Sequence, residues 1–456
     1  MSEEPHPAIT ELNKFKEATP ANMISFDPEQ TYYSTEKATY FVDIGNFYRS
    51  YSRKMPIKSG IKRYLEEKDT PSGEIPALMD HHLENIEIDR AVDWSGKLAG
   101  YLRGITSFAG RQFLITDGYN IPDSATGPCP LHLSIIKQAF PNEDALMAFC
   151  GWLQGGVKAI RAGIHQPAPM PVLAGEKGAG KSLIGYIVKQ VFGGRSANPM
   201  TAWSGTLPWN DNLLGSELLL IDDSVASTDP RARKALGARF KEAIYSDNVE
   251  INTRNKTSIS IRPVWRVMVC CNETPENLSV IPPLEEGIED KIMLLKVSPV
   301  KTPMPAKEPE EKEAFRAALK AELPYFLNWL EKLQIPEHLS DSRSGITAWK
   351  DEELLQAVQE ISPERRMEQL IALSIDKGYL LSELADSAWL SAAEVQEELQ
   401  NRESPTTHQA NNLLKYDTNA GRYLASLVKK RSPWVTDTKP VNGIAKYHIQ
   451  KPPKVE

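Results

Sequence analysis

A glycine loop constrains this chain more than any other stretch of its sequence. Residues 175–182 read Gly-Glu-Lys-Gly-Ala-Gly-Lys-Ser and match the phosphate-binding consensus G-x-x-x-x-G-K-[ST] at every position. A short apolar run, residues 170–174, precedes the loop. Residues 183–192 carry apolar side chains at three- and four-residue spacing, which predicts a helix. Strand, glycine loop and helix is the arrangement that turns backbone N–H groups and a helix N-terminus toward phosphates.

The loop therefore predicts a nucleoside triphosphate site with Mg²⁺. Lys181 would reach the β- and γ-phosphates, and the hydroxyl of Ser182 would bind the metal. A chance glycine-rich loop is the alternative, and the matching flanks disfavour it. The residues expected to contact the nucleotide are Gly175, Glu176, Lys177, Gly178, Ala179, Gly180, Lys181 and Ser182.

Two apolar runs downstream end in polar side chains. Residues 217–221 lead into Asp222 and Asp223, of which one carboxylate would hold Mg²⁺ and the other would orient or deprotonate water. Residues 267–271 lead into Asn272, whose amide is suited to read the γ-phosphate or place water. A plain loop start is the alternative for the aspartates, and a turn-forming residue is the alternative for Asn272.

Between these runs the sequence predicts a helix and a hairpin. Asp229 and Pro230 supply an N-cap and a proline at the first helical position, and the helix should end near Tyr245. Residues 249–253 and 258–261 alternate apolar and polar, so they predict a β-hairpin with a basic tip that contains Arg254 and Lys256. A solvated surface is the alternative explanation for this basic stretch.

The first part of the chain is less informative. We expect mostly helices over residues 93–164, with breaks at 104–110 and 122–130. Aromatic and basic residues between 40 and 63 fit a core strand and a solvated helix better than a nucleic-acid surface. Residues 301–312 read as a linker. Residues 313–375 predict amphipathic helix with a core-facing stripe of Leu319, Leu323, Phe326, Leu327 and Leu330.

The C-terminal region predicts a winged helix. A capping box at residues 391–394 begins one helix, and residues 418–431 form a second periodic segment. Two strand-like runs, 434–439 and 444–449, then flank an Asn-Gly pair, the strongest short hairpin signal. One-sided positive charge suits duplex DNA, although winged helices also bind proteins. The candidate DNA contacts are Lys429, Lys430, Arg431 and Lys446.

Composition fits a soluble globular protein, with 41% hydrophobic and 25% charged residues and a net charge of −7. Any basic surface is therefore local. Residues 1–20 contain no apolar run, and the longest purely aliphatic block is 218–221, so we expect neither a signal peptide nor a membrane span. The four cysteines form no C-x-x-C pattern, and a cytoplasmic location is expected. Cys270 and Cys271 should face opposite sides of one strand.

Taken in order, these motifs over residues 165–300 resemble the superfamily-three helicase ATPases, and most closely the helicase half of phage and mobile-element primase-helicases. The resemblance implies an AAA+-like core, ATP as the nucleotide, a hexameric ring and single-stranded DNA in the channel. It implies that Asp222 binds the metal, Asp223 activates water, Asn272 is the sensor and Lys256 touches DNA.

The sequence departs from that pattern at one place. The family usually has an arginine shortly after the sensor that completes the neighbouring subunit's site, and here only Lys291 is found there. A lysine supplies the charge without the bidentate fork. Either Lys291 serves less well in this role, or one of Arg239, Arg262 and Arg266 replaces it, or the assembly differs from a standard ring.

We therefore expect an α/β protein with four parts: a mostly helical region (1–164), a P-loop ATPase core with a parallel sheet (165–300), a linker and helical lid (301–385) and a winged helix (386–456). The expected function is an ATP-dependent DNA helicase or replication initiator, with replication proteins as possible partners and no membrane. The alternative is a DNA-associated ATPase switch that assembles and recruits partners without unwinding. A small-molecule kinase is disfavoured, because it needs neither a basic hairpin nor a winged helix.

Overall fold

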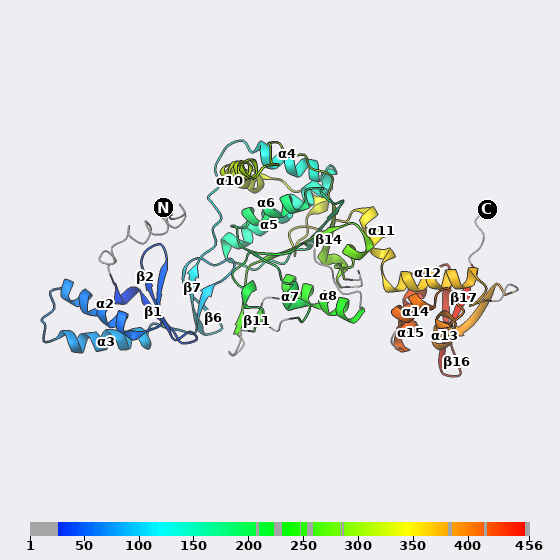
Figure 1. Ribbon diagram of the computed structural model, residues 1–456, viewed down its shortest axis with the longest axis horizontal. Helices are drawn as coiled ribbons and strands as arrows, with labels where there is room; N and C mark the ends of the chain where they lie inside the picture. The colour runs from blue at the N-terminus through cyan, green and yellow to red at the C-terminus, as the bar shows by residue number, and fades with distance from the viewer. Residues whose placement is uncertain are drawn as a thin grey trace, which may run out of the picture.

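The computed structural model describes residues 26–206, 209–222, 230–246, 248–252, 259–282, 284, 287–381, 385–414 and 417–451. Three parts follow one another along its long axis, with a central sheet flanked by helices and a smaller part at each end (Figure 1). Asp223, Arg254 and Lys256 lie outside the described residues. In the part of the chain that is described, no helix is both long and apolar enough to span a bilayer.

A five-stranded parallel sheet forms the centre. Its strands lie in the order β14-β8-β13-β10-β9, and every neighbouring pair is parallel. The strand that carries Asn272 therefore lies between the strand of the glycine loop and the strand of Asp222. The bounds are β8 (Met170–Gly175), β9 (Ser196–Ala197), β10 (Leu218–Asp222), β13 (Arg266–Asn272) and β14 (Ile292–Lys296).

Helices cover both faces of this sheet, which is why its strands are apolar on both sides. One hydrophobic cluster contains Cys270, and a second contains Cys271, so the two thiols do face opposite sides of β13 as expected. Figure 1 shows α5 and α6 on one side of the sheet and α7 and α8 on the other. The helices of the first side are α4 (Pro130–Ala139), α5 (Glu143–Ala162), α6 (Lys181–Val191) and α10 (Pro309–Lys332).

The second side is built from shorter elements. Helix α8 (Pro230–Tyr245) begins and ends where the sequence predicts, and β11 (Val249–Ile251) pairs antiparallel with β12 (Ile259–Ile261), which confirms the stem of the hairpin. The remaining elements here are α7 (Met200–Trp203), η2 (Asp211–Leu213), α9 (Pro275–Leu278), η3 (Glu289–Lys291) and α11 (Glu352–Glu360).

The N-terminal part contains two sheets, so the expectation of a mostly helical region needs correction. Helices within the segment 93–164 begin only at Pro130, and the stretch before it holds three strands whose buried residues Phe113, Leu114 and Ile115 fill a core. Glycines that were interpreted as helix breaks mark strand ends, since Gly104 begins β6. The second sheet, β5-β7-β6, comprises β5 (Trp94–Lys97), β6 (Gly104–Phe108) and β7 (Arg111–Asp117).

The first N-terminal sheet, in the order β3-β2-β1-β4, packs against two helices. Tyr40 is buried in a strand, and Lys62 and Arg63 are exposed on the helix that follows, which confirms the reading of that stretch as core strand and solvated helix. The elements are η1 (Pro28–Gln30), β1 (Thr31–Ser34), β2 (Thr39–Asp43), β3 (Tyr48–Tyr51), α2 (Lys54–Glu67), α3 (Ile75–Glu87) and β4 (Ala91–Val92).

A buried carboxylate ties this N-terminal part to the central sheet. Glu217, next to the start of β10, accepts hydrogen bonds from the Nε of Arg195 at 2.9 Å and from the backbone N–H of Gly100 at 3.1 Å. The backbone N–H of Ala99 also donates to Leu214 O, and that of Val264 donates to Ala99 O. The chain around Gly100 is thus fixed at the amino end of the sheet.

Helix α10 begins at Pro309, inside the expected linker, and its predicted stripe of Leu319, Leu323, Phe326, Leu327 and Leu330 is buried. A side chain of α10 also caps the N-terminus of α4. The carboxylate of Glu322 accepts from the backbone N–H groups of Leu131 and His132 in the first turn of α4, and from His132 Nδ1 at 2.8 Å. After α10 the chain continues through the short 3-10 helix η4 (Glu337–Leu339) to α11 and α12 (Pro363–Asp376).

The C-terminal part joins three helices to a small sheet, in the order β15-β17-β16. Ser391 and Glu394 form the predicted capping box, and Asn442 and Gly443 have the two positive φ angles, 52° and 78°, of a tight hairpin. Neither β15 nor α14 is predicted from the sequence. The elements are β15 (Ser387–Ser391), α13 (Ala392–Gln400), α14 (Thr407–Leu413), α15 (Asp417–Lys429), β16 (Val435–Val441) and β17 (Ile444–Gln450).

Candidate nucleotide-binding site

The glycine loop joins the end of β8 to the start of α6. A Cβ atom at Gly175 would lie 2.6 Å from the backbone oxygen of Val297, so no side chain fits at this position. Gly178 and Gly180 have φ angles of +85° and +100°, which side chains rarely allow. The chain thus turns tightly at the N-terminus of α6, where the free N–H groups of the first turn attract an anion.

Lys181 fills the inside of this loop. Its side chain is buried, and its ammonium donates to Gly175 O at 2.9 Å, to Glu176 O at 2.8 Å and to Asn272 Oδ1 at 2.9 Å. All three acceptors are neutral, so the positive charge of Lys181 has no compensating carboxylate among these contacts. A phosphate oxygen entering the loop would accept a charge-assisted hydrogen bond from this ammonium.

Asn272 and Asp222 lie at the same edge of the sheet as the loop. Asn272 is the register partner of Gly175, and Asp222 is the partner of Cys270, two residues before Asn272 on β13. Because all strands are parallel, this edge is the carboxyl edge, where ligands of open α/β sheets bind. The structure thus brings together the loop, Asn272 and the end of the acidic strand, as the sequence predicts.

The polar residues of the loop suit a polyphosphate and a hard cation. Glu176, Lys177 and Ser182 are exposed around the loop, and Asp222 is exposed at the end of β10. A hydroxyl and a carboxylate are the oxygen ligands that Mg²⁺ prefers, and Mg²⁺ keeps several waters besides. Among the described residues, no group of three or more His, Cys, Asp and Glu side chains forms a ready metal site.

Lys291 lies in a cluster around the ring of Tyr245. Its ammonium is 4.6 Å from the ring centroid and donates to Asp290 Oδ1 at 2.8 Å, which lowers the pKa of Asp290. The guanidinium of Arg343 is also 4.6 Å from this ring. Sequence reasoning missed Arg343, since it is far from Lys291 along the chain and only the fold brings both cations to one tyrosine.

The three alternative arginines occupy different surroundings. Arg266 is buried, its Nη1 donates to Gln166 O at 2.7 Å, and burial lowers its pKa to about 10. It therefore has no access to another subunit, and this alternative is removed. Arg239 is exposed and paired with Glu242 at 2.9 Å, and Arg262 lies over the ring of Phe108.

The candidate DNA residues of the C-terminal part are exposed, apart from Lys446. Lys429, Lys430 and Arg431 lie at the end of α15. Lys430 and Arg431 also line a cavity of about 540 Å³ whose other wall includes Glu360. Lys446 is half-buried and lies 3.4 Å from the carboxylate of Glu394, so its charge is already matched.

The fold has solved counterparts. The apo structure of the NrS-1 C-terminal region superposes with a TM-score of 0.53 and 13% identity, covering 92% of this chain and 96% of that one. The chain has the fold of that region. An A-form apo structure of the same region gives a TM-score of 0.50 with the same coverage. SCCmec type IV Cch, described as an active helicase, gives a TM-score of 0.43 at 9% identity, too low to support an argument.

Sequence comparisons add one match. The model of a family of unknown function, DUF5906, matches residues 173–282, which contain the glycine loop, Asp222 and Asn272. A search of the curated proteins finds no significant match. The match covers the segment that holds the candidate site and leaves both ends of the chain outside it.

Proposed function

We propose that this chain is an ATPase that acts on DNA, as a helicase or replication initiator of the phage or mobile-element type. The observation that carries the proposal is the contact of Lys181 with Asn272 inside a glycine loop at the carboxyl edge of a parallel sheet. This arrangement places a cation, a neutral amide and a helix N-terminus around one point, which is what a triphosphate requires.

Each polar residue of the candidate site would have its own role in ATP hydrolysis. Lys181 would exchange its backbone acceptors for phosphate oxygens, and this exchange needs little movement because the ammonium already lies in the loop. Ser182 and Asp222 would hold Mg²⁺, which neutralises developing charge on the phosphates. Asn272, freed from Lys181, would hold the attacking water, and Asp223 would orient or deprotonate it.

Two further parts of the proposal concern DNA and assembly. The order of one strand, three helices and a two-stranded hairpin supports a winged helix in the C-terminal part, in which the exposed Lys429, Lys430 and Arg431 would bind duplex phosphates. The basic hairpin with Arg254 and Lys256 would hold single-stranded DNA in the channel of a ring, most simply a hexamer. Lys291, or Arg343 on the same tyrosine ring, would complete the site of the neighbouring subunit.

The test measures ATP hydrolysis with and without single-stranded DNA, beside a strand-displacement assay. Lys181→Ala should lower turnover by about 100-fold or more, as expected for loss of a preorganised charge. Lys62→Ala is the control, because Lys62 is an exposed lysine of α2 outside the glycine loop, and it should change turnover little.

The outcomes separate the alternatives. Full turnover in Lys181→Ala, with normal folding, would overturn the ATPase assignment. Turnover that DNA stimulates, without strand displacement on any forked or tailed substrate, would replace the helicase by the ATPase switch. Loss of turnover in Lys181→Ala together with strand displacement by the wild-type protein would support the proposal in full.

A further inference from the structure

A cavity of about 370 Å³ lies at the amino end of the central sheet, beside the stem of the hairpin. We call it the hairpin-stem pocket. Trp265, on its wall, immediately precedes β13, whereas Asn272 is the last residue of that strand. Seven strand residues at about 3.3 Å each separate the two by about 23 Å. The pocket is therefore distinct from the nucleotide site. It is lined by Ala202, Trp203, Gly205, Asn210, Leu213, Arg239, Glu242, Ala243, Val249, Glu250, Asn252 and Trp265.

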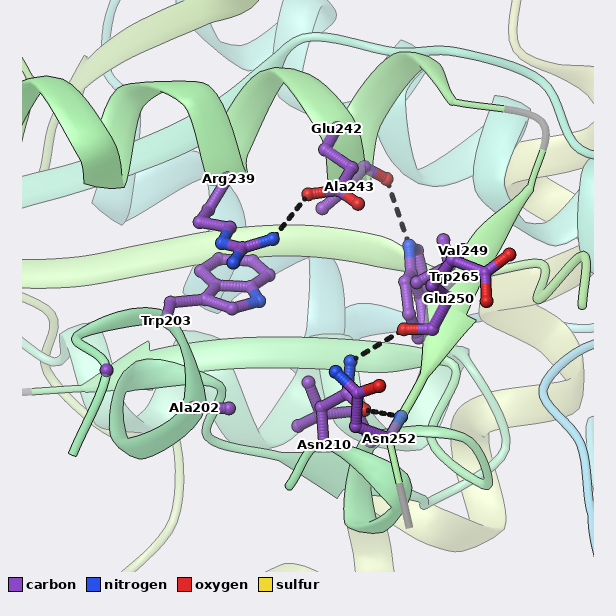
Figure 2. Close-up of a pocket in the computed structure, with 12 residues that line it drawn as sticks. Ala202, Trp203, Asn210, Arg239, Glu242, Ala243, Val249, Glu250, Asn252 and Trp265 are labelled. Carbon is purple, nitrogen blue, oxygen red and sulfur yellow. Dashed lines mark hydrogen bonds and ion pairs between the residues drawn. The ribbon is translucent and has the colours of Figure 1, made fainter. Parts of the chain in front are cut away.

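Two tryptophans give this pocket an aromatic wall on each side (Figure 2). Trp265 is buried, and its Nε1–H donates to Ala243 O at 2.9 Å, so its ring is fixed. Trp203 is half-buried and packs edge-to-face against Phe240, with 5.5 Å between ring centroids. Fixed indole rings are good platforms for a flat ligand, because stacking on them costs little side-chain entropy.

The side chain of Asn210 holds two segments of the pocket wall together through hydrogen bonds to the backbone. Asn210 donates from Nδ2 to Glu250 O at 3.0 Å, and its Oδ1 accepts from the backbone N–H of Asn252 at 2.8 Å. One amide side chain thus joins the segment before η2 to strand β11. Because this amide is already used, the polar groups that the described lining offers to a ligand are the Arg239–Glu242 pair and the side chain of Asn252.

The charges of the pocket exclude several ligand classes. Among the described residues that line it, Arg239 is the one cation, and Glu242 matches its charge at 2.9 Å. Because the charges of this pair cancel, the described wall offers little attraction to a phosphate or another anion. A purely apolar ligand would leave the guanidinium, carboxylate and amide groups without partners. A flat, neutral ring with hydrogen-bonding edges satisfies both the aromatic faces and the polar rim.

We propose that the hairpin-stem pocket binds a nucleobase. Arginine, glutamate and asparagine are the side chains whose donors and acceptors match the edges of bases, and stacking on Trp203 would hold the ring face. The volume lies in the range of small-ligand sites. The base comes either from single-stranded nucleic acid or from a free nucleotide. The proposal goes beyond the proposed function, because it requires neither hydrolysis nor the glycine loop.

The test compares an oligothymidylate of about eight nucleotides with an abasic strand of equal length, with binding to the full chain measured by fluorescence anisotropy. Both strands carry the same phosphates, so a difference in affinity reports base contacts alone. Wild-type protein should prefer the strand with bases by about 5- to 150-fold, the range of one base–aromatic stack. Trp203→Ala should remove most of this preference, and Trp203→Phe should keep most of it.

A variant that fills the pocket and a control variant complete the test. Ala202→Leu fills the pocket without removing Trp203, and it should also remove the preference even if Trp203→Ala fails to fold. Trp389→Ala is the control, since Trp389 lies on the C-terminal sheet beside Lys439 and should leave the preference unchanged. An unchanged preference in folded Trp203→Ala or Ala202→Leu, or no preference in the wild type, would overturn the proposal.

Free deoxynucleosides distinguish the two sources of the base, because they have no phosphate for the glycine loop. If the base comes from a free nucleotide, the nucleosides compete with the oligothymidylate at millimolar concentration, and Ala202→Leu abolishes this competition. If only the strand supplies the base, the nucleosides do not compete. The background Lys181→Ala keeps the base preference in either case, so loss of ATP turnover and failure of this proposal are separate results.

Discussion

The ammonium of Lys181 and the side-chain oxygen of Asn272 are joined by a 2.9 Å hydrogen bond across the ends of two neighbouring strands. The amide oxygen thus accepts a hydrogen bond from the lysine and holds its side chain in the loop. Its position depends on the register of β13 against β8, because Asn272 is opposite Gly175. A one-residue slip would turn the amide to the other face of the sheet.

Asn272→Ala should lower ATP turnover by about 100-fold, the usual cost of one positioned polar group at a reacting centre. Nucleotide affinity should change less, since the loop and Lys181 remain. Steady-state hydrolysis and equilibrium nucleotide binding measure the two effects. Asn277→Ala is the matched control, because Asn277 is a half-buried asparagine of α9 whose side chain donates to Thr274 Oγ1. Equal turnover in Asn272→Ala and the wild type would remove Asn272 from the site.

Gly175→Ala should destabilise the protein by about 1–3 kcal/mol, the usual cost of inserting atoms into a packed region. The added Cβ would meet the backbone oxygen of Val297 at 2.6 Å, and a backbone atom cannot rotate away. Gly155→Ala is the control, because a Cβ there meets nothing within 4 Å in the middle of α5. That variant should be slightly more stable than the wild type, since alanine favours helix over glycine. Urea unfolding of both variants gives the comparison.

Glu217→Ala should cost about 3–5 kcal/mol, because it leaves the partly buried guanidinium of Arg195 and the N–H of Gly100 without their acceptor. The exposed pair of Lys62 and Glu66 is the control, and Glu66→Ala should change stability by about 0.5 kcal/mol or less. The free energy of unfolding in urea measures both. Equal effects of the two variants would show that Glu217 does not tie the N-terminal part to the sheet.

Stability should fall as the pH drops below about 6.5, the ordinary pKa of histidine. Burial lowers the pKa of His132, whereas the contact with Glu322 raises it, and burial is the larger effect. Between the lowered pKa in the folded state and 6.5, the unfolded chain binds more protons than the folded one. Unfolding is therefore favoured by acid in this window, by at most about 1.4 kcal/mol per pH unit for one group.

Stability profiles between pH 7.5 and 5 test this dependence. His132→Gln removes the titrating ring and keeps a donor for Glu322, so its profile should be flatter than that of the wild type in the window below about pH 6.5. His338→Gln is the control, since His338 is exposed beside Asp144, and its profile should keep the slope of the wild type. A wild-type profile with no loss below this pH, or an identical slope in His132→Gln, would contradict the expectation.

Local patterns predicted the central elements because their causes are local. The glycines of the loop, the apolar runs of β10 and β13, and the Asn-Gly turn each depend on a few neighbouring residues. Helix α8 and the stem of β11 and β12 were found for the same reason. The strand order was beyond this reasoning, since nothing near Asn272 in the sequence says that β13 lies beside β8.

The missed features are contacts between distant residues. Glu322 caps α4 from a helix 190 residues later, and Arg343 reaches Tyr245 from another part of the chain. The strands β5, β6 and β7 were missed because the glycines at 104 and 110 are equally typical of strand ends and helix breaks. Nothing in the sequence indicates that Trp203 and Arg239 lie close together, and only the fold places both on the wall of one pocket.

The alternation of Cys270 and Cys271 gives the molecule two internal reporters. Cys271 is the only cysteine in the cluster on its side of the sheet, whereas Cys129, Cys150 and Cys270 belong to the cluster on the other side. A thiol reagent reaches each residue only after the layer above it has opened. The time at which Cys271 becomes alkylated, relative to Cys270, therefore measures which helical layer separates from β13 first, without the introduction of any label.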